Sequence, residues 1–267
     1  MQITTVYLLD LNGRLPAHFD AAVFADTGDE PAAVYRHLDW LRSLGGPPII
    51  VRTAGKLGDD LIAGRNSTGQ RFVSIPAYTA PDGSHEAVGQ MKRQCSKEYK
   101  VEVVERTIRR EILGLKPRAR WPRGIVVDHY FGISLEEARR TIGIRKRVLP
   151  PRQRPHFPLV DELRWTRGDC VRWLERRVPH QVPRSACVFC PYRSDAEFLR
   201  LKETDAGGWH RAVEVDEAVR TQDLSKKFKQ KIYIHPTARP LATVILRGEG
   251  QGVFPNFVQE CEGVCGV

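Results

Sequence analysis

The sequence predicts an α/β fold in which helices flank a parallel sheet. Residues 21–25 form a continuous apolar run of strand length, and residues 48–52 are the next predicted strand. A helix that begins at Pro31 separates them. A strand, a helix and a strand within about thirty residues make a βαβ unit, whose two strands run parallel. A further strand of this sheet is predicted at residues 125–133.

The remaining helices are predicted where apolar residues recur every three or four positions. Together with the helix at Pro31, the predicted helices span residues 3–12, 31–44, 101–115, 134–143, 166–177 and 194–222. Ser134 and Glu137 form a capping box, Gly143 ends that helix, and a break near Gly207 divides the last segment in two. Residues 55–92 are rich in loop-forming residues, with one short strand candidate at residues 71–75.

Composition narrows the class of protein. The chain has 267 residues, of which 41% are hydrophobic, and no apolar run approaches the ~18 residues of a membrane span. No export signal is recognisable, so we expect a cytoplasmic protein without a membrane partner. Six cysteines in such a chain indicate metal binding or catalysis rather than a disulfide scaffold. The formal net charge of +10 favours an anionic partner such as a nucleotide, sulfate or nucleic acid.

The cysteines provide the sharpest motif. Cys187 and Cys190 are two residues apart, a spacing that lets both thiols bind one metal centre from a tight turn. Redox dithiols and zinc sites use the same spacing, and buried inert thiols are the alternative. Cys95, Cys261 and Cys265 can also be recruited, whereas Cys170 lies within a predicted helix and is expected to pack.

Basic residues gather in two neighbouring stretches of the chain. They are Lys116, Arg118, Arg120 and Arg123 beside Trp121, and Arg139, Arg140, Arg145, Lys146, Arg147, Arg152 and Arg154. Together they could follow a phosphate backbone beside a stacking ring, so nucleic acid, either tRNA or DNA, is a candidate partner. The alternative is a solvated basic face.

Three segments, residues 26–30, 93–100 and 187–191, together resemble the phosphoadenosine-phosphosulfate reductase family of the adenine nucleotide alpha-hydrolase superfamily. The resemblance implies a Rossmann-like parallel sheet that binds ATP or a related adenine nucleotide at the carboxyl ends of its strands. The nucleotide-binding residues would be Asp26, Thr27, Gly28, Lys97 and Lys100.

The iron–sulfur branch of this family is the most similar, and it implies a 4Fe-4S cluster held by Cys95, Cys187 and Cys190. The fourth ligand would be Cys261 or Cys265; we take Cys261 as the ligand and Cys265 as the catalytic thiol. Zinc is the alternative metal. Gln94 stands where adenylylsulfate reductases have a further cysteine.

One part of the family pattern is missing from the sequence. The phosphate-binding loop and the strand before it do not occur, and residues 1–5 resemble the end of such a loop. A late start annotation, a substitute segment or an adapted fold would each account for this. We therefore expect the chain as written to bind ATP weakly or not at all.

Taken together, the sequence predicts a nucleotide-binding α/β domain at residues 1–160 and a helical region with the cysteine metal site at residues 161–267. The predicted function is adenine-nucleotide-dependent sulfur transfer or reduction, with thiolation of a nucleic acid as the specific form. The alternatives are a sulfonucleotide reductase and a non-enzymatic, metal-stapled nucleic-acid-binding protein.

Overall fold

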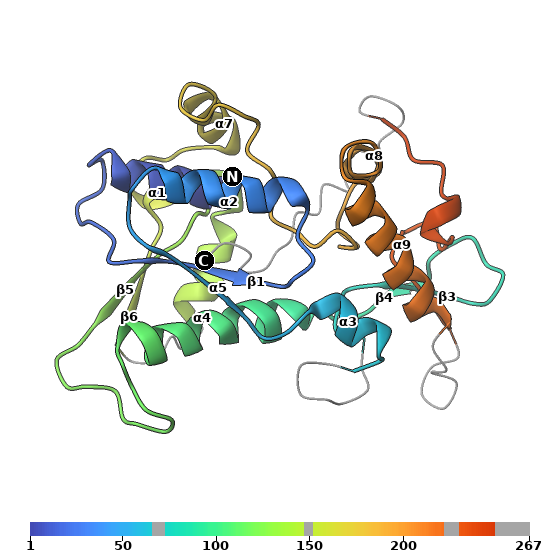
Figure 1. The fold of residues 1–267 in the computed structure, drawn as a ribbon, viewed down its shortest axis with the longest axis horizontal. Coiled ribbons are helices and arrows are strands. Elements are labelled where there is room, and N and C mark those ends of the chain that lie inside the picture. Colours follow the sequence, from blue (N-terminus) through green and yellow to red (C-terminus); the bar gives the residue numbers. More distant parts are fainter. Residues whose placement is uncertain (66–72, 147–151, 222–229, 249–267) are drawn as a thin grey trace.

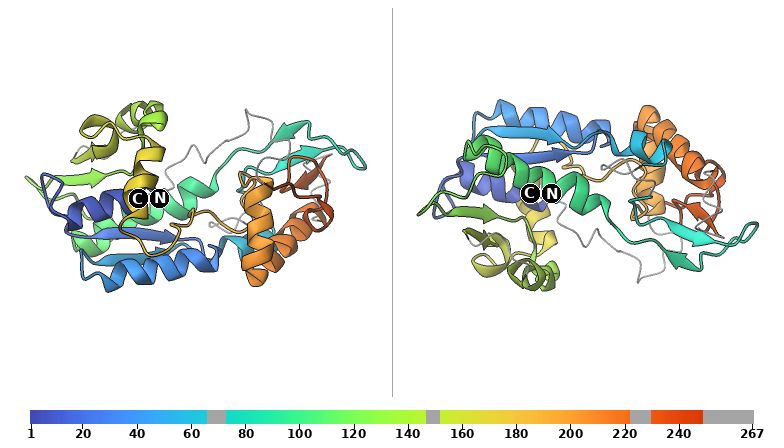
Figure 2. Two further views of the ribbon diagram at one scale, coloured as in Figure 1. Left: turned by 90° about the horizontal axis from the view of Figure 1, so that it is seen from above. Right: turned by 90° about the horizontal axis from the view of Figure 1, so that it is seen from below.

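The computed structural model describes residues 1–65, 73–146, 152–221 and 230–248, and the molecule is elongated (Figures 1 and 2). One end is built around two pairs of parallel strands with helices packed on them. The other end contains two longer helices, a short helix and a small antiparallel sheet. Figure 2 shows the two ends from opposite sides.

The predicted βαβ unit is confirmed. Strand β1 (Ala22–Asp26) pairs in parallel with β2 (Ile49–Thr53), and helix α2 (Ala32–Ser43) connects them. Val23 and Ala25 of β1 are buried against helix α4 (Glu102–Thr107), which continues into a π-helical turn at Ile108. Alternate residues of the apolar run that predicted the strand, Val23 and Ala25, are thus the ones it buries.

The prediction of a single parallel sheet is wrong for the described residues. Strand β5 (Val127–Tyr130) pairs in parallel with β6 (Gln153–His156), and this pair forms a sheet separate from β1 and β2. The two pairs are linked through side chains instead, because Val127 packs in the same cluster as Val23 and the α4 residues. The structure is therefore α/β, with small parallel sheets.

Helix α1 (Gln2–Leu11) is almost entirely buried at this end of the molecule. Its residues Val6 and Leu9 pack against Cys170 of helix α7 (Arg167–Glu175). Cys170 is a core residue, as expected. Helix α7 lies beyond residue 160 in the sequence, yet it packs on the amino-terminal helix.

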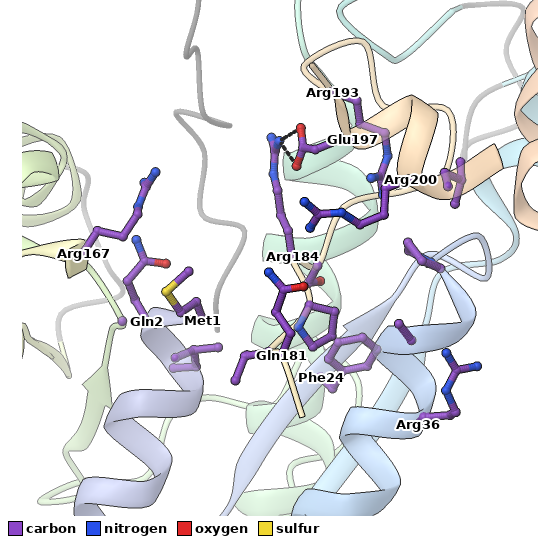
Figure 3. A pocket seen from close by; sticks show the side chains of 18 of the residues that line it. Met1, Gln2, Phe24, Arg36, Arg167, Gln181, Arg184, Arg193, Glu197 and Arg200 are labelled. Carbon is purple, nitrogen blue, oxygen red and sulfur yellow. Dashed lines mark hydrogen bonds and ion pairs between the residues drawn. The ribbon is translucent and has the colours of Figure 1, made fainter. Parts of the chain in front are cut away.

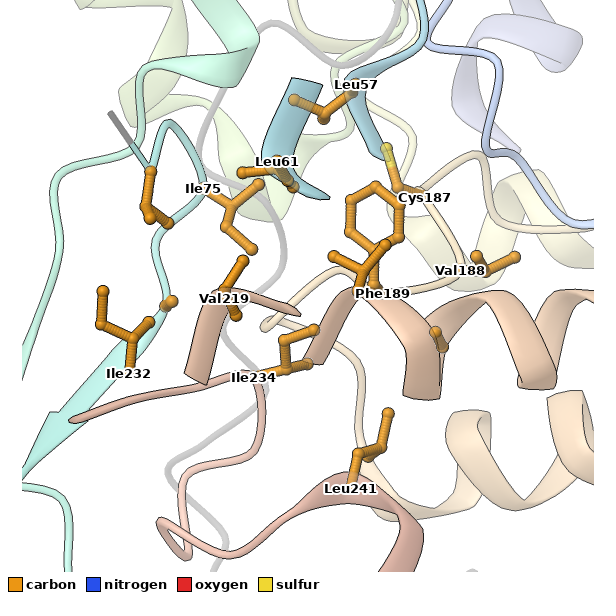
Figure 4. Packing of buried hydrophobic residues seen from close by; sticks show 14 of the residues in the cluster. Leu57, Leu61, Ile75, Cys187, Val188, Phe189, Val219, Ile232, Ile234 and Leu241 are labelled. Atoms are coloured by element: carbon orange, nitrogen blue, oxygen red, sulfur yellow. The ribbon is translucent and has the colours of Figure 1, made fainter. Parts of the chain in front are cut away.

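The opposite end is assembled from distant segments of the chain (Figure 4). Helix α8 (Asp195–Thr204) and helix α9 (Ala206–Thr221) share a core with Leu57 and Leu61 of helix α3 (Leu57–Ile62). Strand β3 (Tyr78–Ala80) pairs on its two sides with β4 (Gly89–Gln90) and β7 (Lys231–Tyr233). Part of the loop-rich segment 55–92 thus belongs to this core, and the packing crosses the predicted boundary at residue 160.

Two helix ends differ from the prediction. Ser134 caps no helix through its side chain, and helix α5 (Arg139–Lys146) continues past Gly143. The break between α8 and α9 lies at Asp205, while Gly207 and Gly208 belong to the first turn of α9. The Asp205 carboxylate accepts hydrogen bonds from the backbone N–H groups of Gly208 (2.9 Å) and Ala32 (2.8 Å), so it serves the amino ends of both α9 and α2.

Arg211 of α9 ties the two ends of the molecule together. Its Nε donates to the buried carboxylate of Asp29 at 2.9 Å, and its Nη2 contacts Asp59 of α3. The second oxygen of Asp29 accepts the N–H of Gly58 at 2.7 Å. No helix in the described part of the chain is long and apolar enough to cross a membrane.

Candidate functional site

The turn after β1 is fixed by a compact set of hydrogen bonds. Asp26 accepts the N–H of Gly28 at 2.8 Å and the hydroxyl of Tyr35 at 3.0 Å. Gly28 has a φ of 76°, and a Cβ there would lie 2.8 Å from Cγ of Lys56. A side chain at this position would therefore be both strained and obstructed.

The turn that carries Cys187 and Cys190 docks onto this segment. The N–H of Val188 donates to the carbonyl of Asp29 at 2.8 Å, and Thr27 Oγ1 lies 3.1 Å from Cys187 Sγ. Arg193 is buried behind the turn, where its Nε donates to the carbonyl of Cys187 at 3.0 Å. The carboxyl end of β1 and the cysteine turn are thus one structural unit, although 160 residues separate Thr27 from Cys187.

Cys95 joins the two cysteines of the turn at a small cavity of about 30 Å³, which we call the cysteine cavity. Its polar and sulfur-bearing lining comprises Thr27, Arg93, Cys95, Ser96, Lys100, Cys187, Cys190 and Tyr192. Among the described residues, no three metal-ligating side chains are grouped closely enough to hold an ion. Cys261 and Cys265 lie outside the described residues.

The thiol of Cys187 is in an environment that disfavours its ionisation. Burial raises its pKa well above the usual value, and the nearby carboxylate of Glu30 raises it further. Lys100 opposes this effect, and its Nζ lies 3.5 Å from Glu30 Oε1. Without a bound cation, Cys187 is therefore a protonated thiol at neutral pH, which is not a nucleophilic state.

A much larger cleft of about 440 Å³ opens beside the cysteine cavity (Figure 3). Seven of its lining side chains are cationic and three are acidic, so its surface attracts anions. The cations are Arg36, Lys100, Arg140, Arg167, Arg184, Arg193 and Arg200, and the acids are Glu137, Glu197 and Asp205. Lys100 lines both cavities, which makes them neighbours.

The arginines enter the cleft from both sides. Figure 3 shows Arg167 and Gln2 on one side, and Arg184, Arg193 and Arg200 on the other. Arg184 Nη1 donates to both oxygens of Glu197, at 2.8 and 2.7 Å. Burial opposes ionisation of Glu197, but Arg184 outweighs it and holds the pKa of this carboxyl below its usual value.

Apolar side chains and a helix end complete the lining. Phe24 of β1, Val182 and Pro183 offer surfaces on which a flat ring could pack. Gln2 and Ile3, in the first turn of α1, also line the cleft. Helix amino ends carry backbone N–H donors and a positive dipole, both of which suit a phosphate.

The structure brings only some of the predicted nucleotide-binding residues to these cavities. Thr27 lines the cysteine cavity, and Lys100 lines both cavities. Asp26 and Gly28 remain in the turn and line neither. Lys97 is also absent from both linings; it extends into solvent, 3.9 Å from Glu102.

Sequence reasoning missed most of the cleft arginines. Arg36, Arg184 and Arg200 are isolated in the sequence and form a group only in the fold. The one sequence feature that could have pointed to this group was the closeness of Arg184 to the Cys-x-x-Cys turn.

A comparison with protein-family models, curated proteins and solved structures finds no match for this chain.

Proposed function

We propose that the protein binds an adenine nucleotide in the arginine-lined cleft and carries out sulfur transfer or reduction at the neighbouring cysteines. The observation that carries this proposal is the pair of adjoining cavities, one cationic and one lined by Cys95, Cys187 and Cys190. Lys100 stands between them. A group attached to the nucleotide phosphates would therefore lie close to the thiols.

The cleft offers a suitable surface to each part of a nucleotide. Guanidinium groups bind phosphate oxygens through paired hydrogen bonds, and Arg36, Arg167 and Arg200 line the cleft from three separate helices. Phe24 and Pro183 can pack against the base. Arginine side chains would supply the positive charge that a glycine-rich loop provides in other nucleotide sites.

The cysteine cavity is the proposed place of the metal centre. Three thiols line this one cavity, and thiolates are the donors expected for an iron–sulfur cluster or for zinc. They are not grouped closely enough to hold an ion in this structure, so binding would require them to move closer together. Cys261 is the proposed fourth ligand and Cys265 the proposed catalytic thiol. When bound, a 4Fe-4S cluster would supply an iron at which sulfide can be held. A zinc ion would instead stabilise the turn structurally.

The proposed acceptor of sulfur is a nucleic acid, in keeping with the net charge of +10. An acceptor carbonyl oxygen attacks the α-phosphorus of ATP, and pyrophosphate leaves. Sulfide then attacks the carbon of the activated carbonyl group and displaces AMP, which leaves with the former carbonyl oxygen. The sum converts the acceptor carbonyl, ATP and hydrogen sulfide into the thiocarbonyl, AMP and pyrophosphate.

Calorimetric titration with ATP tests the nucleotide site, and helix α2 supplies a matched pair of variants. Arg36 lines the cleft, whereas Arg42 lies on the same helix, is exposed and pairs with Asp39. We expect Arg36→Gln to weaken ATP binding about tenfold, the equivalent of one charge-assisted hydrogen bond, and Arg42→Gln to leave it unchanged.

The concentration of ATP should extend to the millimolar range, because an arginine-based site without a glycine-rich loop is expected to be weak. If the wild-type protein binds no ATP at millimolar concentrations, the adenine-nucleotide proposal fails. The non-enzymatic nucleic-acid-binding alternative would then be preferred.

A further inference from the structure

We infer that the loop at residues 113–126 is a preformed docking surface for the phosphate backbone of a nucleic acid. It connects the helix ending at Ile112 with strand β5. The proposal deepens the proposed function, on which it rests for the choice of nucleic acid as the acceptor. Its evidence is independent of the cleft.

The loop is held in one conformation by arginines from outside it. Arg109 Nη2 donates to the carbonyl of Ala119 at 2.7 Å, and Arg110 Nη1 donates to the carbonyl of Leu115 at 2.8 Å. Arg152, which precedes β6, donates to the carbonyls of Trp121 and Pro122. These bonds fix the backbone, so little conformational entropy remains to be lost when a ligand binds.

All the charged side chains that this loop presents to solvent are cationic. Lys116, Arg118, Arg120 and Arg123 are all exposed, and none forms an ion pair with another described residue. No Asp or Glu occurs in the sequence between residues 112 and 127. The loop therefore concentrates four positive charges that nothing in the described part of the chain neutralises.

The second basic stretch of the sequence behaves differently. Three of its arginines are paired with acids from elsewhere: Arg140 with Glu137, Arg145 with Asp161, and Arg154 with Asp128. Arg152 is committed to the loop carbonyls. The sequence analysis grouped the two stretches as one candidate phosphate-binding surface. The fold engages four of the seven cations of the second stretch and leaves Arg139 and Lys146 exposed, whereas all four cations of the 113–126 loop are exposed and form no ion pair with a described residue.

The chemistry of the loop favours a nucleic acid over an anionic membrane. Three of the four cations are arginines, whose guanidinium forks match phosphate oxygens. A membrane-binding loop of this kind would also expose an aromatic side chain, but Trp121 packs against the cluster formed by β1 and α4. Its Nε1 donates to the carbonyl of Ile125 at 2.9 Å, and Arg109 stacks 5.9 Å from its ring centre. The exposed apolar side chains of the loop, Ile125 and Val126, lie at its end next to β5 rather than among the cations. The binding is thus expected to be electrostatic and independent of base sequence.

The loop lies away from the nucleotide cleft. It enters the amino end of β5, whereas Gly132, just beyond the carboxyl end of that strand, lines the cleft. Figure 1 shows the loop projecting from the outer end of the strand pair β5–β6. A long polyanion could be anchored there while a nucleotide occupies the cleft.

Fluorescence anisotropy with a labelled 20-nucleotide single strand and a 20-base-pair duplex tests the proposal over a range of salt concentrations. The loop variant replaces Lys116, Arg118, Arg120 and Arg123 by Gln. The control variant replaces four exposed arginines elsewhere that also form no ion pair with a described residue, Arg14, Arg65, Arg176 and Arg239, by Gln. Both lower the net charge of +10 by four, so they differ only in where the charge is lost.

We expect the loop variant to lower the slope of log affinity against log salt by about 3, at roughly 0.7–0.9 per lost phosphate contact, and the control variant to change it much less. The double variant Arg120→Glu/Arg123→Glu should weaken binding as well, with an unchanged circular dichroism spectrum.

Equal affinities and slopes for the loop and control variants would overturn the proposal. Loop-dependent binding to vesicles rich in phosphatidylserine, without binding to nucleic acid, would also overturn it. ATP binding in the loop variant, measured separately, should match the wild type, so a failure here is distinct from a failure of the nucleotide site.

Discussion

His37 is a buried histidine whose lowered pKa makes the stability of the fold depend on pH. It is buried on α2, where Nδ1 lies 2.8 Å from His180 Nε2 and Nε2 lies 3.0 Å from Thr4 Oγ1. Its ring also stacks on Trp40. Burial, with a further contribution from His180, lowers the pKa of His37 to about 4.

This pKa predicts a loss of stability in mild acid. The folded-state pKa is below the ordinary value of 6.5, so the unfolded chain binds the proton more readily. The contribution of His37 is complete above about pH 6.5 and is lost as the pH falls towards 4. The total is about 3 kcal/mol, at ~1.4 kcal/mol per unit of pKa.

The measurement is urea unfolding of wild-type protein and His37→Gln between pH 4.5 and 7.5. We expect the variant to show a flatter dependence of unfolding free energy on pH. His129, whose pKa burial also lowers to about 4, is unchanged in the variant and contributes to the remaining slope, as does the buried amino group of Met1. Identical slopes in the two proteins would show that His37 does not titrate in this way.

At the scale of the element, the cysteine turn joins the carboxyl end of β1 to the helical end of the molecule. The backbone bond from Val188 to Asp29 and the side chain of Arg193 hold the turn in place without any metal. A metal centre would therefore be added to an existing turn rather than create it. Loss of the metal should change activity more than folding.

The metal content of anaerobically purified protein tests this element. We expect brown protein with a broad absorption band near ~400 nm, and we expect Cys187→Ala to remove both the colour and the iron. Cys170→Ala is the matched control, since Cys170 is also a buried thiol but packs between α1 and α7. Colourless protein with about one zinc per chain would favour the zinc-stapled alternative. Equal iron in both variants would remove Cys187 from the ligand set.

Which elements could be predicted from the sequence depends on the range of their interactions. The β1–α2–β2 unit was predictable because the apolar residues of its strands and the proline that precedes its helix, Pro31, are local signals. Strands β3, β4 and β7 have two or three residues each, and the partners β3 and β7 lie far apart in the chain. Such strands exist because of tertiary contacts, which the pattern of a short segment does not contain.

The same distinction applies to the candidate site. Cys95, Cys187 and Cys190 could be grouped in advance because cysteine spacing is a recognisable motif. The cleft arginines could not, because each of them is unremarkable in its own helix or loop. Asp26 illustrates the opposite error: a polar residue at the end of a strand suits a ligand, but here it stabilises a turn through Gly28 and Tyr35.

At the scale of the whole molecule, the cleft lies where the two ends meet. Gln2 and Arg167 reach it from the end that holds the parallel strands, and Arg200 reaches it from α8 (Figure 3). Arg211 and the cysteine turn connect the same two ends beside it. A ligand that bridges the arginines would therefore hold both ends together, which is why the account depends on what occupies this cleft.

Photolabelling with 8-azido-ATP, followed by peptide mapping, tests this central claim most directly. The account predicts label on peptides that line the cleft, within residues 24–36, 97–104 and 181–201, and loss of that label when unmodified ATP is added in excess. Phe24 is expected to lie nearest the base, and Lys100 is expected to lie near the phosphates. Label confined to peptides outside the cleft, or label that excess ATP does not reduce, would contradict the account.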